Sequence, residues 1–138
     1  MSDMFDVDSQ HLSTTGGCLC SEVSYRVTGP LRAVAGCHCQ QCRRTSGHFV
    51  AATSAAKTEI EIEGEVRWFQ SSETAKRGFC PECGSNLFWD DGGERLSIMA
   101  GSLDGPTGLQ MDRHIHVGSK GDYYTLDGTQ PHFEGSDT

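Results

Sequence analysis

Three cysteines stand within the short stretch Gly36-Cys37-His38-Cys39-Gln40-Gln41-Cys42-Arg43-Arg44. Their C-x-C-x-x-C spacing is too dense for core packing and too cramped for a set of disulfides. Thiolates bind soft metal ions, so the stretch predicts a metal site. Three protein ligands leave a fourth position, and the group that fills it decides between an enzyme and a scaffold.

The other four cysteines predict a separate structural site. Cys80-Pro81-Glu82-Cys83-Gly84 has the pattern of a zinc knuckle, in which backbone amides point at the sulfurs and glycine permits a tight return. Cys18 and Cys20 are the expected partners, because residues two apart on a strand share one face. We expect Zn²⁺ rather than rubredoxin-like iron, because iron sites usually show two matching C-x-x-C knuckles.

A histidine or a substrate could complete the three-cysteine set. The candidate histidines are His38, His48, His114 and His116. His38 sits between two ligands and would have trouble bending back to the same ion, whereas His114 and His116 could share a strand face. If the position is free, Zn²⁺ would hold a thiol substrate as its thiolate or polarise a carbonyl group.

An anionic substrate would need local cations, because the chain carries a net charge of −8. Arg43 and Arg44 follow Cys42 directly and are the best-placed candidates, with Lys76 and Arg77 next. The same acidity argues against nucleic acid as a partner, since nucleic-acid binding needs a basic face.

The composition favours one cytoplasmic domain. A length of 138 residues suits a single core, no long apolar run predicts a membrane span, and the first ten residues lack a signal-peptide pattern. In a reducing compartment, clustered cysteines are more often metal ligands or catalytic groups than disulfides, and seven cannot all pair. We expect a flexible lead-in over residues 1–15, one domain over 16–133 and a tail over 134–138.

The 17 glycines and several short alternating stretches predict a mostly β domain without a long helix. One turn of helix is expected over 40–45, closed by Ser46-Gly47. Two hairpins are expected, one turning at Gly64-Glu65 and one at 90–93. Strands are predicted over 23–27, 31–35, 49–52, 57–63, 66–69, 86–89, 96–100, 114–117 and 123–126.

Five motifs occur in an order that resembles the glutathione-dependent formaldehyde-activating enzyme family, whose domain centromere protein V shares. They are G-G-C-x-C from Gly16, C-H-C-x-x-C-R-R-x-S-G from Cys37, F-C-x-x-C-G-S from Phe79, G-x-L-D from Gly101 and H-I at His114. The resemblance implies an Mss4-like or β-tent zinc-binding fold of short antiparallel sheets. It also implies a structural ion on Cys18, Cys20, Cys80 and Cys83 and a catalytic ion on Cys37, Cys39 and Cys42.

The family's named activity joins formaldehyde and glutathione to S-hydroxymethylglutathione. We therefore expect a zinc-dependent carbon–sulfur lyase or synthase acting on a glutathione-like thiol and a small aldehyde, with small molecules rather than nucleic acid or membrane as partners. One alternative is a non-catalytic, zinc-stabilised protein-interaction module. Another is a thiol-based metal buffer or redox sensor.

Overall fold

Two β-sheets form the framework of the computed structural model, which describes residues 13–126 and 128–136. The smaller sheet has the order β1-β2-β5, with β1 at Thr14–Gly17, β2 at Ser24–Val27 and β5 at Ile60–Glu63. The larger sheet has the order β10-β3-β4-β9-β8-β7-β6. Its strands are β3 (Val34–Cys37), β4 (Val50–Ala56), β6 (Arg67–Gln70), β7 (Lys76–Phe79), β8 (Asn86–Asp90), β9 (Arg95–Met99) and β10 (Met111–Ile115).

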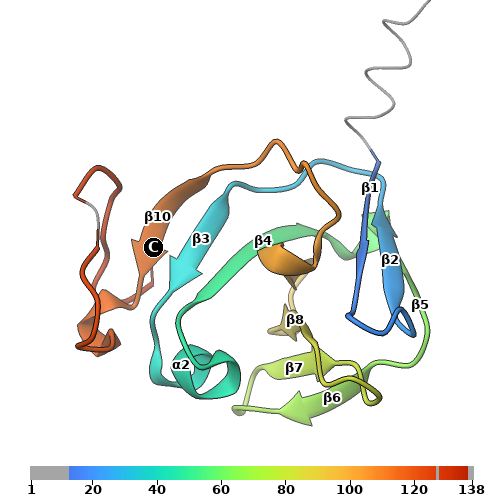
Figure 1. Ribbon diagram of the computed structural model, residues 1–138, viewed down its shortest axis with the longest axis horizontal. Helices are drawn as coiled ribbons and strands as arrows, with labels where there is room; N and C mark the ends of the chain where they lie inside the picture. The colour runs from blue at the N-terminus through green and yellow to red at the C-terminus, as the bar shows by residue number, and fades with distance from the viewer. Residues whose placement is uncertain (1–12, 127, 137–138) are drawn as a thin grey trace, which may run out of the picture.

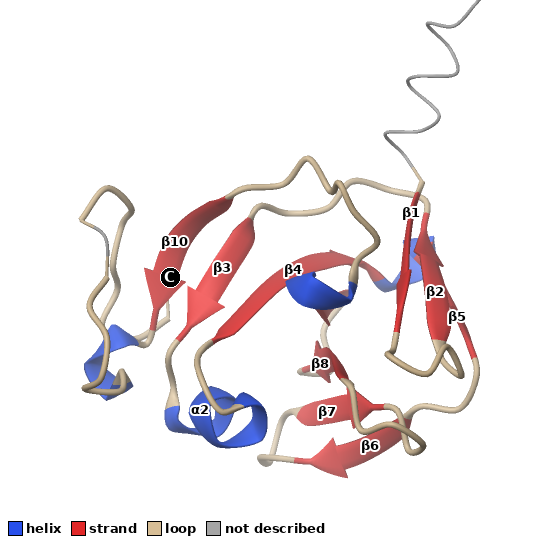
Figure 2. Cartoon of the chain, in the orientation of Figure 1, coloured by secondary structure: helices blue, strands red, loops and turns tan. Residues whose placement is uncertain are grey.

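The larger sheet curves around the middle of the molecule, with β10, β3 and β4 on one side and β6, β7 and β8 below (Figure 1). The smaller sheet stands on the other side. Helix α2 (Gln40–Ser46) lies next to the ends of β3 and β4, as Figure 2 shows. Three 3₁₀ turns complete the described elements: η1 (Lys57–Glu59), η2 (Ala100–Ser102) and η3 (Val117–Ser119).

The core lies between the two sheets. Strand pairing sets Thr53, Ile98, Phe88 and Gly78 side by side across four strands, and all four are buried. From the smaller sheet, Tyr25 packs edge-on against Phe88 with ring centroids 5.4 Å apart. Because side chains alternate along a strand, the neighbours of this row face the other side of the larger sheet, where the candidate site lies.

Helix α2 is the short helix expected from the sequence. It begins after Cys39, whose side chain accepts the amide hydrogen of Cys42, and ends at Gly47 in a left-handed conformation (φ 86°). Glycine adopts that conformation without a Cβ clash, so the predicted Ser46-Gly47 stop is confirmed.

The mostly β prediction is confirmed, and so is the hairpin of β8 and β9. The hairpin expected at Gly64-Glu65 is wrong. Strand β5 pairs with β2, while β6 pairs with β7, so this turn carries the chain from one sheet to the other. Two-residue alternation specifies a strand and a buried face, but it does not specify the pairing partner.

Two further differences concern the C-terminal part of the chain. Strand β10 pairs parallel to β3, an exception to the expected antiparallel pairing. Residues 123–126, predicted as a strand, form none. Tyr123 and Tyr124 instead make side-chain contacts with His48 and His38.

The domain boundaries can be compared only within the described residues. Strand β1 begins at Thr14, two residues before the expected domain start at Gly16, and residues 1–12 of the expected lead-in lie outside the described part. At the other end, the amide of His116 donates to the carbonyl of Gly135 at 2.7 Å, so part of the expected tail contacts the domain. Within the described ranges, no helix is long and apolar enough to cross a membrane.

Candidate metal and active site

Cys18, Cys20, Cys80 and Cys83 come together although the chain separates them into two distant pairs. Their sulfurs lie within 4.8 Å of one another, and Cys20 Sγ is 3.7 Å from both Cys18 Sγ and Cys80 Sγ. A tetrahedral Zn²⁺ with Zn–S bonds of about 2.3 Å would separate its sulfurs by about 3.8 Å. The observed spacing therefore fits a four-sulfur zinc site.

The turns around these sulfurs supply hydrogen-bond donors. The amides of Glu82 and Cys83 donate to Cys80 Sγ at 3.3 and 3.5 Å, and the amide of Val23 donates to Cys18 Sγ at 3.2 Å. Such bonds stabilise thiolates and orient them toward an ion. The donor geometry is that expected of a knuckle at Cys80–Cys83.

The first cysteine pair is held by a turn rather than by the strand face that the sequence suggested. Cys18 and Cys20 follow the end of β1, and the amide of Ser21 donates to the carbonyl of Cys18 at 3.3 Å. Ser21 adopts a positive φ of 72°. That conformation strains a residue with a Cβ, so the turn places its two sulfurs at some conformational cost.

Cys37, Cys39 and Cys42 form the second group, with sulfurs within 4.8 Å of one another. Cys37 ends β3, Cys39 caps α2 and Cys42 lies in its first turn. Hydrogen bonds from the neighbouring thiols hold the pKa of Cys39 far below its ordinary value, and the same contacts raise the pKa of Cys37. Ionisation of one thiol therefore disfavours ionisation of its neighbours. All three cysteines can be thiolates together only if a cation offsets their mutual repulsion.

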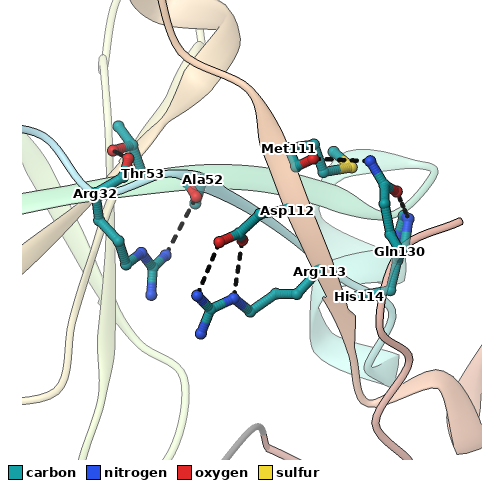
Figure 3. Close-up of polar contacts among 8 residues, drawn as sticks. All are labelled: Arg32, Ala52, Thr53, Met111, Asp112, Arg113, His114 and Gln130. Carbon is teal, nitrogen blue, oxygen red and sulfur yellow. Dashed lines mark hydrogen bonds and ion pairs between the residues drawn. The ribbon is translucent and has the colours of Figure 1, made fainter.

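His38, which stands between Cys37 and Cys39 in the sequence, takes part with His114 in a hydrogen-bond chain. Gln130 Nε2 donates to the carbonyl of Met111 at 2.7 Å, so its Oε1 accepts from His114 Nε2 at 2.9 Å (Figure 3). His114 Nδ1 then accepts from His38 Nε2 at 2.9 Å. His38 Nδ1 accepts in turn from the hydroxyl of Tyr124.

This chain commits every ring nitrogen of His38 and His114. Burial lowers the pKa of His38 to about 4, with the nearby His114 as a further cause, so its ring is neutral at pH 7. A neutral imidazole has one donor and one acceptor nitrogen, and both are in use. Neither histidine therefore has a nitrogen to offer as a fourth ligand in this arrangement.

The two remaining candidate histidines differ in position. His48 is exposed, and its Nδ1 contacts the hydroxyl of Tyr123 at 2.8 Å. His116 lines the cavity beside the three cysteines and has a positive φ of 57°. No histidine joins the three-sulfur group within the described residues.

A cavity of about 340 Å³ borders the three cysteines on the face of the larger sheet opposite the core. Strand register produces its wall. Arg77 pairs with Trp89 and Trp89 with Ser97, so these three side chains form a row across β7, β8 and β9. Cys37 reaches the same cavity from β3. All three cysteines therefore line a space large enough for a small molecule.

Arg77 is the buried cation of this cavity, with 5 % of its surface exposed. Its Nη2 lies 3.4 Å from Gln41 Oε1 and 3.9 Å from Cys42 Sγ. Arg32 also lines the cavity, and its Nη2 donates to the carbonyl of Ala52 at 3.2 Å (Figure 3).

The two arginines first suggested for substrate binding lie elsewhere. Arg43 Nε donates to the carbonyl of Ser119 at 3.1 Å, and Arg44 is exposed. Neither is among the residues that line the cavity. Their role in binding a substrate carboxylate stays a prediction.

The sequence pointed less clearly to the residues that complete the site. Arg77 stood behind Arg43 and Arg44 in the prediction, because distance along the chain was the only measure available. Tyr124 and Gln130 were not singled out, since nothing in their local sequence marks a contact with the buried histidines. Arg32 was missed because no motif surrounds it.

Comparisons with known proteins identify the family and the fold. The family described as "Glutathione-dependent formaldehyde-activating enzyme" matches residues 13–119. A Schizosaccharomyces pombe protein named as an uncharacterized lyase is 28 % identical over 112 residues, which cover 79 % of this chain and 82 % of the relative. A crystal structure of a Rhodobacter sphaeroides protein shares the fold, with a TM-score of 0.57 and 20 % identity over 86 % of this chain and 98 % of that one. The chain thus belongs to the glutathione-dependent formaldehyde-activating enzyme family.

Proposed function

We propose that the protein is a zinc-dependent carbon–sulfur lyase or synthase that joins a glutathione-like thiol to a small aldehyde. Family membership and the lyase-named relative support a lyase-type enzyme. The finer assignment rests on one observation: Cys37, Cys39 and Cys42 bring three sulfurs together at the wall of a cavity. Three ligands beside a space for substrate is the arrangement of catalytic rather than structural zinc.

Zinc held by these three cysteines would supply Lewis acidity, under which a coordinating thiol loses its proton at neutral pH. The four-cysteine group would hold a second, structural ion. The donor sets fit both roles, because four sulfurs close a tetrahedron whereas three leave one position for an exchangeable ligand. The histidine chain supports that difference by occupying the nitrogens of His38 and His114.

In the proposed reaction, the thiolate sulfur forms a bond to the carbonyl carbon of the aldehyde. The electron pair of the C=O π bond moves to the oxygen, which then takes up a proton. The thiol proton released earlier balances the equation, so no oxidant or reductant is needed. The cavity wall holds the two reactants together, which replaces a bimolecular encounter by an oriented one.

We assign the proton transfer of this reaction to His116. It lines the same cavity as the three cysteines, and imidazole is the usual proton carrier near neutral pH. Its left-handed backbone, with φ of 57°, is a strained conformation of the kind found at functional sites. We expect it to accept the thiol proton and return it to the nascent hydroxyl group.

The experiment is exchange NMR on mixtures of thiol and aldehyde, because the uncatalysed addition also occurs and only its acceleration is informative. Glutathione with formaldehyde is the first pair to test. Zinc-loaded protein should accelerate exchange between free and bound formaldehyde, and a Cys42→Ser variant should not. An unchanged exchange rate with every thiol and aldehyde tested would refute the proposal and favour a non-catalytic zinc module.

A further inference from the structure

We propose that Arg77 binds a carboxylate of the substrate and that the cavity thereby selects anionic over neutral reactants. This inference deepens the proposed function, since it concerns the substrate class of the same site. It assigns a specificity-determining role to a residue outside the cysteine set.

The first observation is the state of the Arg77 side chain. It is buried, with 5 % of its surface exposed, and it is one of the residues that line the cavity. Its Nε has no hydrogen-bond partner, and its Nη2 makes only the long contacts to Gln41 and Cys42. A guanidinium carries five donors and is costly to bury without acceptors. The unused donors therefore await an acceptor from a ligand.

The second observation is the charge of the cavity. The whole chain is acidic, with 19 Asp and Glu against 11 Lys and Arg. Among the described residues that line the cavity, however, the acidic side chains are absent and Arg32 and Arg77 are both present. Ion pairs in the described structure, Lys57 with Asp90 and Arg113 with Asp112, do not involve Arg77. A cationic cavity in an acidic protein favours entry of an anion.

A competing explanation is that Arg77 only compensates the charge of the thiolates. Its Nη2 is 3.9 Å from Cys42 Sγ, and the charge on the guanidinium favours ionised Cys42. Compensation of the thiolates nevertheless leaves Arg77 Nε buried and without a hydrogen-bond partner. A substrate carboxylate would supply an acceptor that the thiolates do not. The geometry of a guanidinium also suits a carboxylate, which it can bind through two parallel hydrogen bonds.

The carboxylate could belong to the thiol or to the aldehyde, and binding measurements distinguish these sources. S-methylglutathione carries carboxylates but no free thiol, and its diethyl ester is the neutral control. Glyoxylate and methyl glyoxylate form the corresponding pair for the aldehyde. Calorimetry on zinc-loaded protein should show at least one acid binding about tenfold or more tightly than its ester.

Arg77→Gln should remove that preference while leaving ester binding and zinc content unchanged. Arg77→Lys should restore part of it, because lysine keeps the charge but not the paired geometry. Equal binding of acid and ester by the wild type, or unchanged acid binding by Arg77→Gln, would overturn the proposal. Loss of zinc from Arg77→Gln would instead show that the residue serves the thiolates.

A second pair of variants covers the case in which Arg77→Gln fails to fold. Thr74 lines the cavity and is exposed, so its substitution leaves the core intact. Thr74→Asp places a negative charge at the cavity and should weaken acid binding, whereas Thr74→Asn should not. Acid binding that is equal in these two variants would count against an anion-selective cavity.

The binding assay needs no turnover, so its outcome is independent of the proposed reaction. If exchange NMR shows no catalysis while acids still bind through Arg77, the reaction fails and the anion site stands. If catalysis is observed and no acid preference exists, the reaction stands and the assignment of Arg77 fails.

Discussion

Removing the four-cysteine group should lower the free energy of unfolding more than removing the three-cysteine group. The four-cysteine group links Cys20 to Cys80, which are 60 residues apart, and so fastens the turn after β1 to the turn after β7. The three-cysteine group spans only the short stretch from Cys37 to Cys42. Both groups bind zinc in our account, but only the first closes a long loop.

Loop-closure entropy gives the size of the difference. The relation used for covalent cross-links assigns about 4 kcal/mol to a 60-residue loop and about 2 kcal/mol to a five-residue loop at 25 °C. The free energy of unfolding of a domain is typically about 5–15 kcal/mol, so a difference of about 2 kcal/mol is measurable. It corresponds to about 1 M in the urea midpoint for an m-value of about 2 kcal/mol/M.

The matched variants are Cys18→Ser/Cys20→Ser and Cys37→Ser/Cys39→Ser. Each removes two sulfurs that are not fully buried, and serine at position 39 keeps the N-cap acceptor of α2. Urea unfolding in excess zinc and reductant should show the larger loss for the first double variant. The same titrations in excess chelator serve as the control, because the difference should vanish without metal. Equal losses in zinc, or a larger loss for the second variant, would refute the reasoning.

Three further predictions concern single residues. Ser21→Gly should raise the free energy of unfolding by about 1 kcal/mol in urea titrations, because glycine tolerates the positive φ found there; a decrease would show that the turn is not strained. Burial raises the pKa of Tyr25 to about 12, so the unfolded chain loses this proton first and stability should fall as pH rises from 10 to 12. Thermal unfolding of Tyr25→Phe should show a shallower alkaline slope, and an identical slope would contradict the assignment. His116→Asn, which suits a left-handed backbone, should lower kcat by about 100-fold or more with zinc content unchanged, whereas an unaffected kcat would remove His116 from the reaction.

Local patterns in the sequence predicted the short elements well. Alternation around Tyr25 and the turn at 90–93 gave strands β2, β8 and β9, because each reflects a half-buried strand or a tight turn. The grouping of seven cysteines into four and three also matches the two sulfur groups. Such groups can be expected from the sequence because few functions other than metal binding need cysteines at such short spacing.

Local patterns could not predict which strands pair across long distances in the sequence. Strand β5 has the alternation of a hairpin partner for β6, yet it pairs with β2. The choice depends on which apolar face is covered, here that of Tyr25 and Val27, and this information is spread over distant residues. The burial of Arg77 could not be predicted for the same reason. It follows from the register of β7 with β8 rather than from the neighbours of Arg77 in the chain.

The central claim is that Cys37, Cys39 and Cys42 hold an accessible zinc ion while the other four cysteines hold a closed one. Zinc release into a chromogenic chelator tests it most directly. We predict two zinc ions per chain, one released much faster than the other, and loss of only the fast phase in Cys42→Ser. A single phase containing both ions, or a fast phase that survives in Cys42→Ser, would contradict the account.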